Sequence, residues 1–228
     1  MATMTLDVNE GVHVLSLINN EGENKLNIDV IGEYAAALDQ VEQYQGDTAL
    51  LIRCEHEKTF STGIDLEWLM SRTDDQRKEF VLAFERVLYR IALLNAPTVV
   101  ALNGNAYAGG AILASACDFK LMRADLGRFC FPEVNIKIPF TDLMMDIVSL
   151  MPDKQALKML TLTGKPFTGV ECEASDVVDA IYPADELQAQ AFGLAKMLAE
   201  KDRATYTTIR NSMRTSISRH AQALGLAD

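Results

Sequence analysis

One uncharged run constrains the fold of this chain more than any other feature of its sequence. No charged residue occurs from Ile91 to Cys117, and the second half of the run, "NGNAYAGGAILASAC", consists mostly of small residues. The run is long enough to cross a bilayer. However, Pro97 and the Gly109-Gly110 pair divide it into shorter pieces and are costly in lipid. We therefore expect a buried segment in which glycine and alanine let another group approach the backbone closely.

The composition limits which class of protein the chain can belong to and which partners it can bind. The chain has 228 residues, 49% of them hydrophobic, so it can bury a substantial core. A formal net charge of −11 disfavours general attraction to nucleic acid or to an anionic membrane. The four cysteines lack C-x-x-C spacing, which predicts reduced, packed thiols in a cytoplasmic compartment. The first residues, "MATMTLDVNE", show no basic and apolar signal region, which favours the same location.

Strands and helices are expected to alternate along the chain. A hairpin is predicted at "TLDV" and "VHVLSLI", around the Glu10-Gly11 turn, and a helix begins after Asn27. Buried strands are predicted at "ALLIRC" and "TVVAL", with a long helix over 74–94 between them, and further strands at "DFKLMRA" and "GRFCF". From Thr141 onward nearly all of the sequence predicts helix. This order is typical of an α/β fold with a parallel sheet and a helical C-terminal part.

Two segments share one layout, a buried strand followed by a glycine turn and the start of a helix. They end in "FSTGIDL" and "NGNAYAGGAIL". Backbone N–H groups at a helix start lack partners, and two of them aimed at one point form an oxyanion hole. The alternative is that Gly109 and Gly110 only allow a helix to pack closely on the sheet. Neither of the phosphate-binding glycine motifs, G-x-x-x-x-G-K-[ST] and G-x-G-x-x-G, is present.

Glu133 is the candidate base. It follows the apolar run that contains Phe129, Phe131 and Pro132. Burial in such surroundings raises the pKa of a carboxyl group, which suits proton transfer near neutral pH. The alternative is a turn glutamate that faces water.

Other catalytic constellations are not supported. His13, His56 and His220 lie near no nucleophile motif, and Ser61 is outside the G-x-S-x-G pattern of hydrolases. Glu55, His56 and Glu57 lack ligand spacing on one helix face, so we expect no metal site.

With these segments in hand, the chain resembles the crotonase, or enoyl-CoA hydratase/isomerase, superfamily. The resemblance runs through "NKLN", "FSTGIDL", "APTVVALNGNAYAGGAILASACDFKLM", "FCFPEVNIKIP" and "ALKMLTLTGKPFTG", in the order of the family. It implies a spiral of ββα turns over 1–182 and a helical trimerisation region over 183–228. It also implies an acyl-CoA thioester as substrate, with coenzyme A as part of that substrate and no separate cofactor. The two oxyanion donors of the family fall on the backbone N–H groups of Ile64 and Gly109.

One departure within the superfamily points to a particular reaction. Hydratases use two glutamates, and here the first of these positions holds Ile112, while the second holds Glu133. A single glutamate is the pattern of Δ3,Δ2-enoyl-CoA isomerases, which "LMRADLGRFCFPEVNIKIP" especially resembles. The resemblance therefore implies that Glu133 moves a proton from C2 to C4 of a 3-enoyl-CoA. The segment "IKIPFTDLM" departs from the glycine-rich turn of many members, which leaves the preferred acyl-chain length open.

Further substrate-binding residues and partners are expected from the same resemblance. The substrate-binding residues are Lys25, as a phosphate partner, and Thr62, Gly63, Gly110, Ile112 and Phe131. We expect a homotrimer or a dimer of trimers, because the region from Pro183 carries apolar residues that a short appendage cannot bury alone. These residues are Leu187, Phe192, Leu194, Met197 and Leu198.

Two other functions stay open at this stage. A hydratase, thioester hydrolase or decarboxylase of the same fold could use the same oxyanion hole, with one glutamate activating water. A non-catalytic acyl-CoA binding protein could keep only the fold. The enzyme hypotheses require Glu133 to lie in the same cavity as the Ile64 and Gly109 amides.

Overall fold

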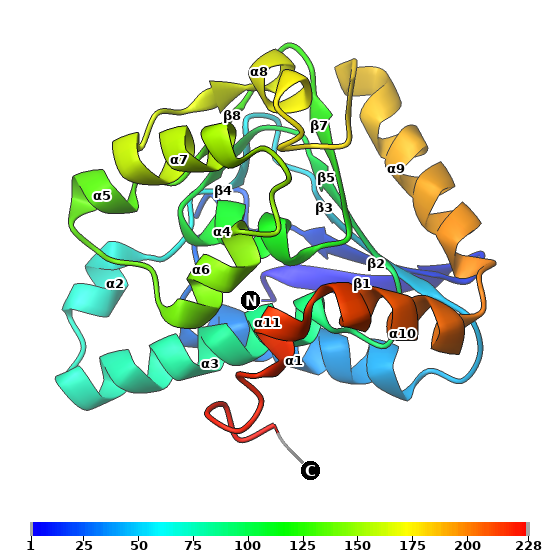
Figure 1. The fold of residues 1–228 in the computed structure, drawn as a ribbon, viewed down its shortest axis with the longest axis horizontal. Helices are drawn as coiled ribbons and strands as arrows, with labels where there is room; N and C mark the ends of the chain where they lie inside the picture. Colours follow the sequence, from blue (N-terminus) through cyan, green and yellow to red (C-terminus); the bar gives the residue numbers. More distant parts are fainter. Residues whose placement is uncertain (1, 227–228) are drawn as a thin grey trace.

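Two β-sheets form the centre of the molecule in the computed structural model, which describes residues 2–226 (Figure 1). The large sheet has the strand order β1-β2-β3-β5-β7-β10, and the small sheet has the order β4-β6-β8-β9. The large sheet contains β1 (Met4–Asn9), β2 (Val12–Leu17), β3 (Ala49–Cys54), β5 (Thr98–Leu102), β7 (Phe119–Arg123) and β10 (Ala180–Tyr182). The small sheet contains β4 (Thr59–Ser61), β6 (Asn105–Tyr107), β8 (Arg128–Cys130) and β9 (Phe167–Thr168). The α/β class is as predicted.

The chain winds between the two sheets as a spiral. The pairs β3 and β4, β5 and β6, and β7 and β8 each place one strand in the large sheet and the next in the small sheet. Within each sheet these strands run parallel, whereas the β1–β2 and β8–β9 pairs are antiparallel. Helices follow these pairs: α2 (Leu66–Met70) and α3 (Asp74–Ala92) after β4, and α4 (Gly109–Ala116) after β6. Another helix, α1 (Ile28–Gln43), connects β2 to β3.

Local sequence signals account for the start of these elements. Asn27 caps α1 by accepting a hydrogen bond from the Val30 N–H, as its position in the sequence predicted. Thr73 begins α3 with a capping box in which Gln76 bonds back to the Thr73 N–H. At the predicted hairpin turn Glu10 and Gly11 both have positive φ, which is the geometry of a tight two-residue connection.

The uncharged run is divided among several buried elements. It includes the last two residues of α3, then β5, β6 and α4, and every residue of β5 and α4 is buried. α4 packs against α3 and α6, so its small side chains lie in the protein core. None of the helices within residues 2–226 has both the length and the apolar character needed to cross a membrane.

The second half of the chain is mainly helical, with two strands that the sequence did not predict. Its helices are α5 (Glu133–Ile136), α6 (Asp142–Val148), α7 (Lys154–Thr163), α8 (Gly169–Ala174), α9 (Ala184–Ala199), α10 (Arg203–Met213) and α11 (Thr215–Ser218). Between them β9 joins the small sheet, and β10 extends the large sheet by pairing with β7. The expectation of nearly continuous helix after Thr141 is therefore wrong at these two short segments.

The apolar residues of α9 are covered within the chain. α9 packs on the outer face of the large sheet, whereas α1, α3, α4 and α6 lie on the other face (Figure 1). Leu187 and Leu198 are buried there, and Phe192 and Leu194 are partly buried, but Met197 is 44% exposed. The reason given from the sequence for expecting a trimer is thus wrong, because the sheet itself buries most of these residues.

Candidate active site

A cavity of about 440 Å³ brings the main candidate residues together. It lies among α2, α3, α4, α5 and α6, and Thr62, Ile64, Gly109, Ile112 and Glu133 all line it. Its other walls are mostly apolar side chains. Concave, largely apolar cavities with a few convergent polar groups are the usual form of small-molecule sites.

Two of the residues that line this cavity, Ile64 and Gly109, have backbone N–H groups without hydrogen-bond partners among the described residues. Leu26 holds the backbone on both sides of Ile64: its N–H donates to the Gly63 carbonyl, and its carbonyl accepts from the Asp65 N–H, both at 2.9 Å. Gly109 is the first residue of α4. Among residues 2–226 no acceptor is found for the N–H of either Ile64 or Gly109. Two free donors at one apolar cavity can stabilise a developing oxyanion.

The residue before Gly109 has a strained backbone. Ala108 has φ 48° and ψ −124°, a combination that residues with a Cβ atom rarely adopt. Its N–H donates to the Cys130 carbonyl at 3.0 Å, and its carbonyl accepts from the Ile112 N–H at 2.9 Å. These two bonds fix the peptide that carries the Gly109 N–H. Strain of this kind is common where a fold holds a group for function.

Glu133 lines the same cavity as Ile64 and Gly109. The residue begins α5, is only 6% exposed, and its Oε2 atom has no hydrogen-bond partner among the described residues. Burial raises the pKa of its carboxyl group from 4.5 to about 7. The alternative of a turn glutamate facing water is therefore excluded. A carboxyl group with this pKa can both accept and return a proton near neutral pH.

Ile112 contributes an apolar side chain to the wall of this cavity. It lies on α4, is buried, and lines the cavity. Among the described residues that line the cavity, Glu133 is the only carboxylate. No second acid is therefore present there to position a water molecule.

The glycines flanking the two amides have packing roles. A Cβ atom on Gly63 would lie 2.7 Å from the Gly109 nitrogen, and one on Gly110 would lie 2.7 Å from the Ser61 Cβ atom. Gly63 thus allows the two amides to approach, and Gly110 allows α4 to pack on β4, which was the alternative weighed for it. Neither glycine lines the cavity, whereas the Thr62 hydroxyl oxygen is buried there without a hydrogen-bond partner in the described part of the chain.

Phe131 and Lys25 are not part of the cavity wall. Phe131 is fully buried and contacts Phe129 and Phe140 in edge-to-face pairs, so a substrate in the cavity cannot reach its ring. Its expected role in substrate binding is therefore corrected to one in the core behind Glu133. Lys25 is exposed and does not line the cavity, so its contact with a phosphate group stays a prediction.

Several wall residues were not foreseen from the sequence. They come from α2, α3 and α6 and from the segment after α5: Leu69, Val81, Phe84, Met144 and Ile138. Val81 and Phe84 lie three residues apart on α3, the spacing that core residues of a helix also have. The periodicity of apolar residues in the sequence therefore does not distinguish a cavity wall from a packed interior.

The three histidines have local partners outside the cavity. His13 bonds to the Thr48 hydroxyl at 2.8 Å, the His56 ring accepts from the Lys58 and Thr59 N–H groups, and His220 bonds to Asp146 at 2.7 Å. Within residues 2–226 no cluster of three or more His, Cys, Asp or Glu side chains is arranged to hold a metal ion.

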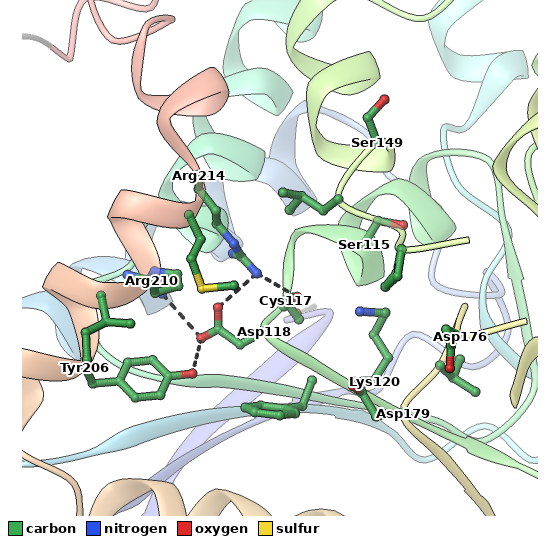
Figure 2. Close-up of a pocket in the computed structure, with 16 residues that line it drawn as sticks. Ser115, Cys117, Asp118, Lys120, Ser149, Asp176, Asp179, Tyr206, Arg210 and Arg214 are labelled. Atoms are coloured by element: carbon green, nitrogen blue, oxygen red, sulfur yellow. Dashed lines mark hydrogen bonds and ion pairs between the residues drawn. The ribbon is translucent and has the colours of Figure 1, made fainter. Parts of the chain in front are cut away.

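A larger cavity, of about 830 Å³, lies beside α10 and has a different character. Figure 2 shows Asp118 at its wall, contacted by Tyr206, Arg210 and Arg214 from α10 and the residue that follows it. The Tyr206 hydroxyl donates to Asp118 at 3.0 Å, and the Arg214 guanidinium pairs with its carboxylate at 3.0 Å. The Asp118 carboxylate thus pairs with two buried guanidinium groups, and these contacts attach the C-terminal helices to the core. We therefore place the candidate active site in the smaller cavity.

Comparison with known proteins agrees with this geometry. The family model described as "Enoyl-CoA hydratase/isomerase" matches residues 7–227. The chain belongs to the enoyl-CoA hydratase/isomerase family. The protein is thus an enzyme of this family within the crotonase superfamily, and an acyl-CoA substrate is consistent with that membership.

Relatives of this chain include proteins named as isomerases and proteins named as hydratases. An Arabidopsis thaliana protein named enoyl-CoA delta isomerase 3 is 31% identical over 94% of this chain and 93% of its own length. A Thermus thermophilus protein named as an enoyl-CoA hydratase is 32% identical over 83% of this chain and 75% of its own length.

Solved structures support the fold assignment. The crystal structure of a Mycobacterium marinum enoyl-CoA hydratase superposes with a TM-score of 0.87 at 19% identity, over 97% of this chain and 96% of that one. At this identity the likeness shows the crotonase-type fold alone.

Proposed function

We propose that this member of the family is a Δ3,Δ2-enoyl-CoA isomerase. The observation that supports the proposal most directly is the pairing of Glu133 with Ile112 in one cavity. The cavity thus offers one proton-transfer group and two free amide donors, and isomerisation needs no more than these. Sequence similarity to the A. thaliana protein named as a delta isomerase agrees with the proposal.

The reaction follows from the positions of these groups. The thioester carbonyl oxygen accepts hydrogen bonds from the Ile64 and Gly109 N–H groups. Glu133 removes a proton from C2, and the electron pair of the C–H bond forms a dienolate whose negative charge rests on that oxygen. When the carbonyl re-forms, the electrons shift to give the C2–C3 double bond, and C4 takes the proton from Glu133. Each amide contributes by stabilising charge that exists only during the reaction.

A pKa near 7 lets Glu133 perform both steps. A carboxylate with an ordinary pKa is a weaker base toward a C–H bond, whereas a carboxyl group with a pKa near 7 can bind the proton in the first step and release it in the second. The apolar wall produces the shift, because burial penalises the charged form.

Ile112 argues against the hydratase alternative. Addition of water to a 2-enoyl-CoA requires a group that holds and activates the water while a second group protonates C2. An isoleucine side chain has no hydrogen-bonding atom and excludes water from that side of the cavity. The hydrolase alternative is disfavoured on the same ground, because Glu133 is the only carboxylate among the described residues that line the cavity.

Replacement of Glu133 by glutamine tests the proposal. Glu133→Gln keeps the shape of the side chain but removes the base, so isomerisation of 3-enoyl-CoA should fall by at least about a hundredfold. Binding of a saturated acyl-CoA should stay nearly intact, which serves as the folding control. Retention of the original isomerisation rate would overturn the proposal. So would efficient hydration of 2-enoyl-CoA by the unmodified protein.

The coenzyme A portion of the substrate is proposed to leave the cavity on the Lys25 side. Leu26 contacts the Gly109 position, since a Cβ atom there would lie 3.2 Å from Leu26 Cδ1. The neighbouring Lys25 ammonium is exposed and free to approach a phosphate group. No further cofactor enters this proposal. Lys25→Ala should weaken binding of free coenzyme A by the modest amount typical of one exposed ion pair.

A homotrimer or a dimer of trimers remains a proposal that rests on the family resemblance. The observation in its favour is on α10, where Ile209 and Met213 are exposed, Met213 by 78%. Exposed neighbouring apolar side chains favour a contact surface. Sedimentation at micromolar concentration tests this, and a clean monomer would contradict it.

A cytoplasmic compartment is likewise proposed, on the state of the thiols. Cys54, Cys117, Cys130 and Cys172 are all free and buried. One A. thaliana relative is named peroxisomal and a mouse relative is named mitochondrial. Fractionation of cells of the source organism, with detection of the protein in each fraction, tests the assignment.

A further inference from the structure

The candidate active-site cavity opens to solvent through an apolar mouth. Leu66 on α2, Ile136 on α5 and Ile138 beyond it all line the cavity, yet each is also exposed. Leu66, for example, is 38% exposed. The cavity is therefore open to solvent at this end. The side chains at its edge are apolar and suit contact with a hydrocarbon chain.

Further exposed apolar side chains lie on the helices that line the cavity. Met70 lies one turn beyond Leu66 on α2 and is 67% exposed. Val134 on α5 and Met145, which follows the cavity residue Met144 on α6, are exposed as well. Single exposed apolar residues are common, but a group that continues a cavity marks a binding surface.

The proposed chemistry fixes the direction in which an acyl chain enters this region. With the thioester oxygen at the Ile64 and Gly109 amides, C2 and C4 must both lie within reach of Glu133. The carbons after C4 then lie beyond Glu133. The lining residues that follow Glu133 along the sequence include Ile136 at the end of α5 and Ile138 after it, which belong to the mouth. A tail too long for the cavity is thus directed outward between α2 and α5, which are neighbours at the left of Figure 1.

We propose that the substrates include long-chain 3-enoyl-CoA thioesters, whose tails leave the cavity through this mouth and lie against Leu66, Ile138 and Met70. The proposal rests on the proposed function, because it places the thioester at the Ile64 and Gly109 amides. Chain length is then limited by solubility of the substrate and not by the volume of the cavity. The occupant of the apolar surface is the acyl tail.

Binding of saturated acyl-CoA thioesters tests the proposal without any reaction. Butanoyl-, octanoyl- and hexadecanoyl-CoA are titrated into the full chain, each below the concentration at which it forms micelles. Affinity should rise by about fourfold for each methylene group that becomes buried. Hexadecanoyl-CoA should bind at least as tightly as octanoyl-CoA. Weaker binding of hexadecanoyl-CoA by tenfold or more would mean a closed cavity and would overturn the proposal.

Two variants locate the tail. Leu66→Gln should lower the hexadecanoyl-to-butanoyl affinity ratio by roughly tenfold, because a polar side chain replaces part of the apolar contact. Met70 does not line the cavity, so Met70→Gln should lower the same ratio by a smaller factor. Leu126→Gln is the matched control, because Leu126 is also 38% exposed but lies between β7 and β8, away from the cavity. An unchanged ratio in Leu66→Gln, or equal changes in Leu66→Gln and Leu126→Gln, would overturn the proposal.

The two proposals fail in different ways. If no 3-enoyl-CoA is isomerised but the affinity ratios behave as expected, the isomerase assignment fails and the tail surface stands. If short 3-enoyl-CoA is isomerised but hexadecanoyl-CoA is rejected, the tail surface fails and the isomerase assignment stands.

Discussion

Gly63 lies directly against the backbone nitrogen of Gly109. A Cβ atom at position 63 would lie 2.7 Å from that nitrogen and 2.8 Å from the Tyr107 carbonyl oxygen. Glycine at position 63 therefore sets how closely the loop that carries the Ile64 N–H can approach the start of α4. The two candidate oxyanion donors depend on this approach, although Gly63 itself does not face the cavity.

A comparison of Gly63 with Gly11 separates the effect of close packing from the effect of a strained backbone. Gly63 and Gly11 have similar φ values, +84° and +80°, but a Cβ atom on Gly11 would meet nothing within 4 Å. Both Gly63→Ala and Gly11→Ala should lose about 1 kcal/mol or more of stability from the positive φ. Only Gly63→Ala should displace the Gly109 amide, and it should lower kcat/KM by about a hundredfold or more. Activity within threefold of the unmodified protein in Gly63→Ala would show that the two amides do not act together.

Part of this site could be predicted from local sequence signals. "FSTGIDL" and "NGNAYAGGAIL" each place small residues between a buried strand and a helix, so that both amides could be recognised one motif at a time. The apolar run before Glu133 gave the direction of its pKa shift. Such features are local, because a strand, a turn and a helix cap are decided by neighbouring residues.

Other features depend on contacts that no single segment contains. β10 has three residues and becomes a strand because β7 offers a free edge, so its own pattern carries little signal. The apolar face of α9 could bind another subunit or its own sheet, and only the fold shows that the sheet covers it. The walls contributed by Val81 on α3 and Met144 on α6 meet in the cavity although they are far apart in the sequence.

The pKa of Glu133 predicts the pH dependence of the reaction. In the proposed mechanism isomerisation requires the ionised Glu133 carboxylate in the free enzyme, and burial raises the pKa of this group to about 7. The value of kcat/KM should therefore increase about tenfold per pH unit below 7 and level off above it. The measurement is kcat/KM for a 3-enoyl-CoA between pH 5.5 and 8.5. A flat profile across this range would remove Glu133 from the role of base.

The same shift predicts that Glu133 weakens the fold as pH rises. The folded-state pKa of about 7 lies above the ordinary value of 4.5, so between these values the unfolded chain loses the proton that the folded chain keeps. Stability therefore falls as pH rises from about 4.5 to about 7, by at most about 3 kcal/mol. A glutamine at position 133 does not titrate, so the stability of Glu133→Gln should not fall in this way. In urea unfolding, the free energy of unfolding of Glu133→Gln minus that of the unmodified protein should increase between pH 5 and pH 8. Parallel pH dependences of the two proteins would contradict the shift.

The buried ion pairs of Asp118 predict a strong effect on stability. Asp118 pairs with Arg210 at 3.4 Å and Arg214 at 3.0 Å, and all three side chains are nearly inaccessible to solvent. Asp118→Asn leaves two buried guanidinium groups without their counter-charge and should cost about 3–5 kcal/mol. Asp125→Asn removes the partner of Arg123 in an exposed pair and should cost less than about 1 kcal/mol. Equal losses in chemical unfolding would show that the cluster does not anchor α10.

The proposed function predicts that position 112 decides which reaction the cavity can perform. Ile112→Glu would place a second carboxyl group in the cavity that holds Glu133. Like-charge repulsion and burial should then raise the pKa of one of the two, so that one carboxyl group is protonated while the other is ionised near neutral pH. That combination can activate water and protonate C2, so hydration of 2-enoyl-CoA should become measurable.

A neutral variant shows whether the gain comes from acid–base chemistry. Ile112→Gln adds polarity and the same length without a titratable group, so it should admit water but produce no hydration. Both variants bury a polar group on α4, and thermal unfolding must first show that each remains folded. Equal hydration by Ile112→Glu and Ile112→Gln would mean that water access alone limits the reaction. No hydration by a folded Ile112→Glu would mean that Ile112 is not what restricts this cavity to isomerisation.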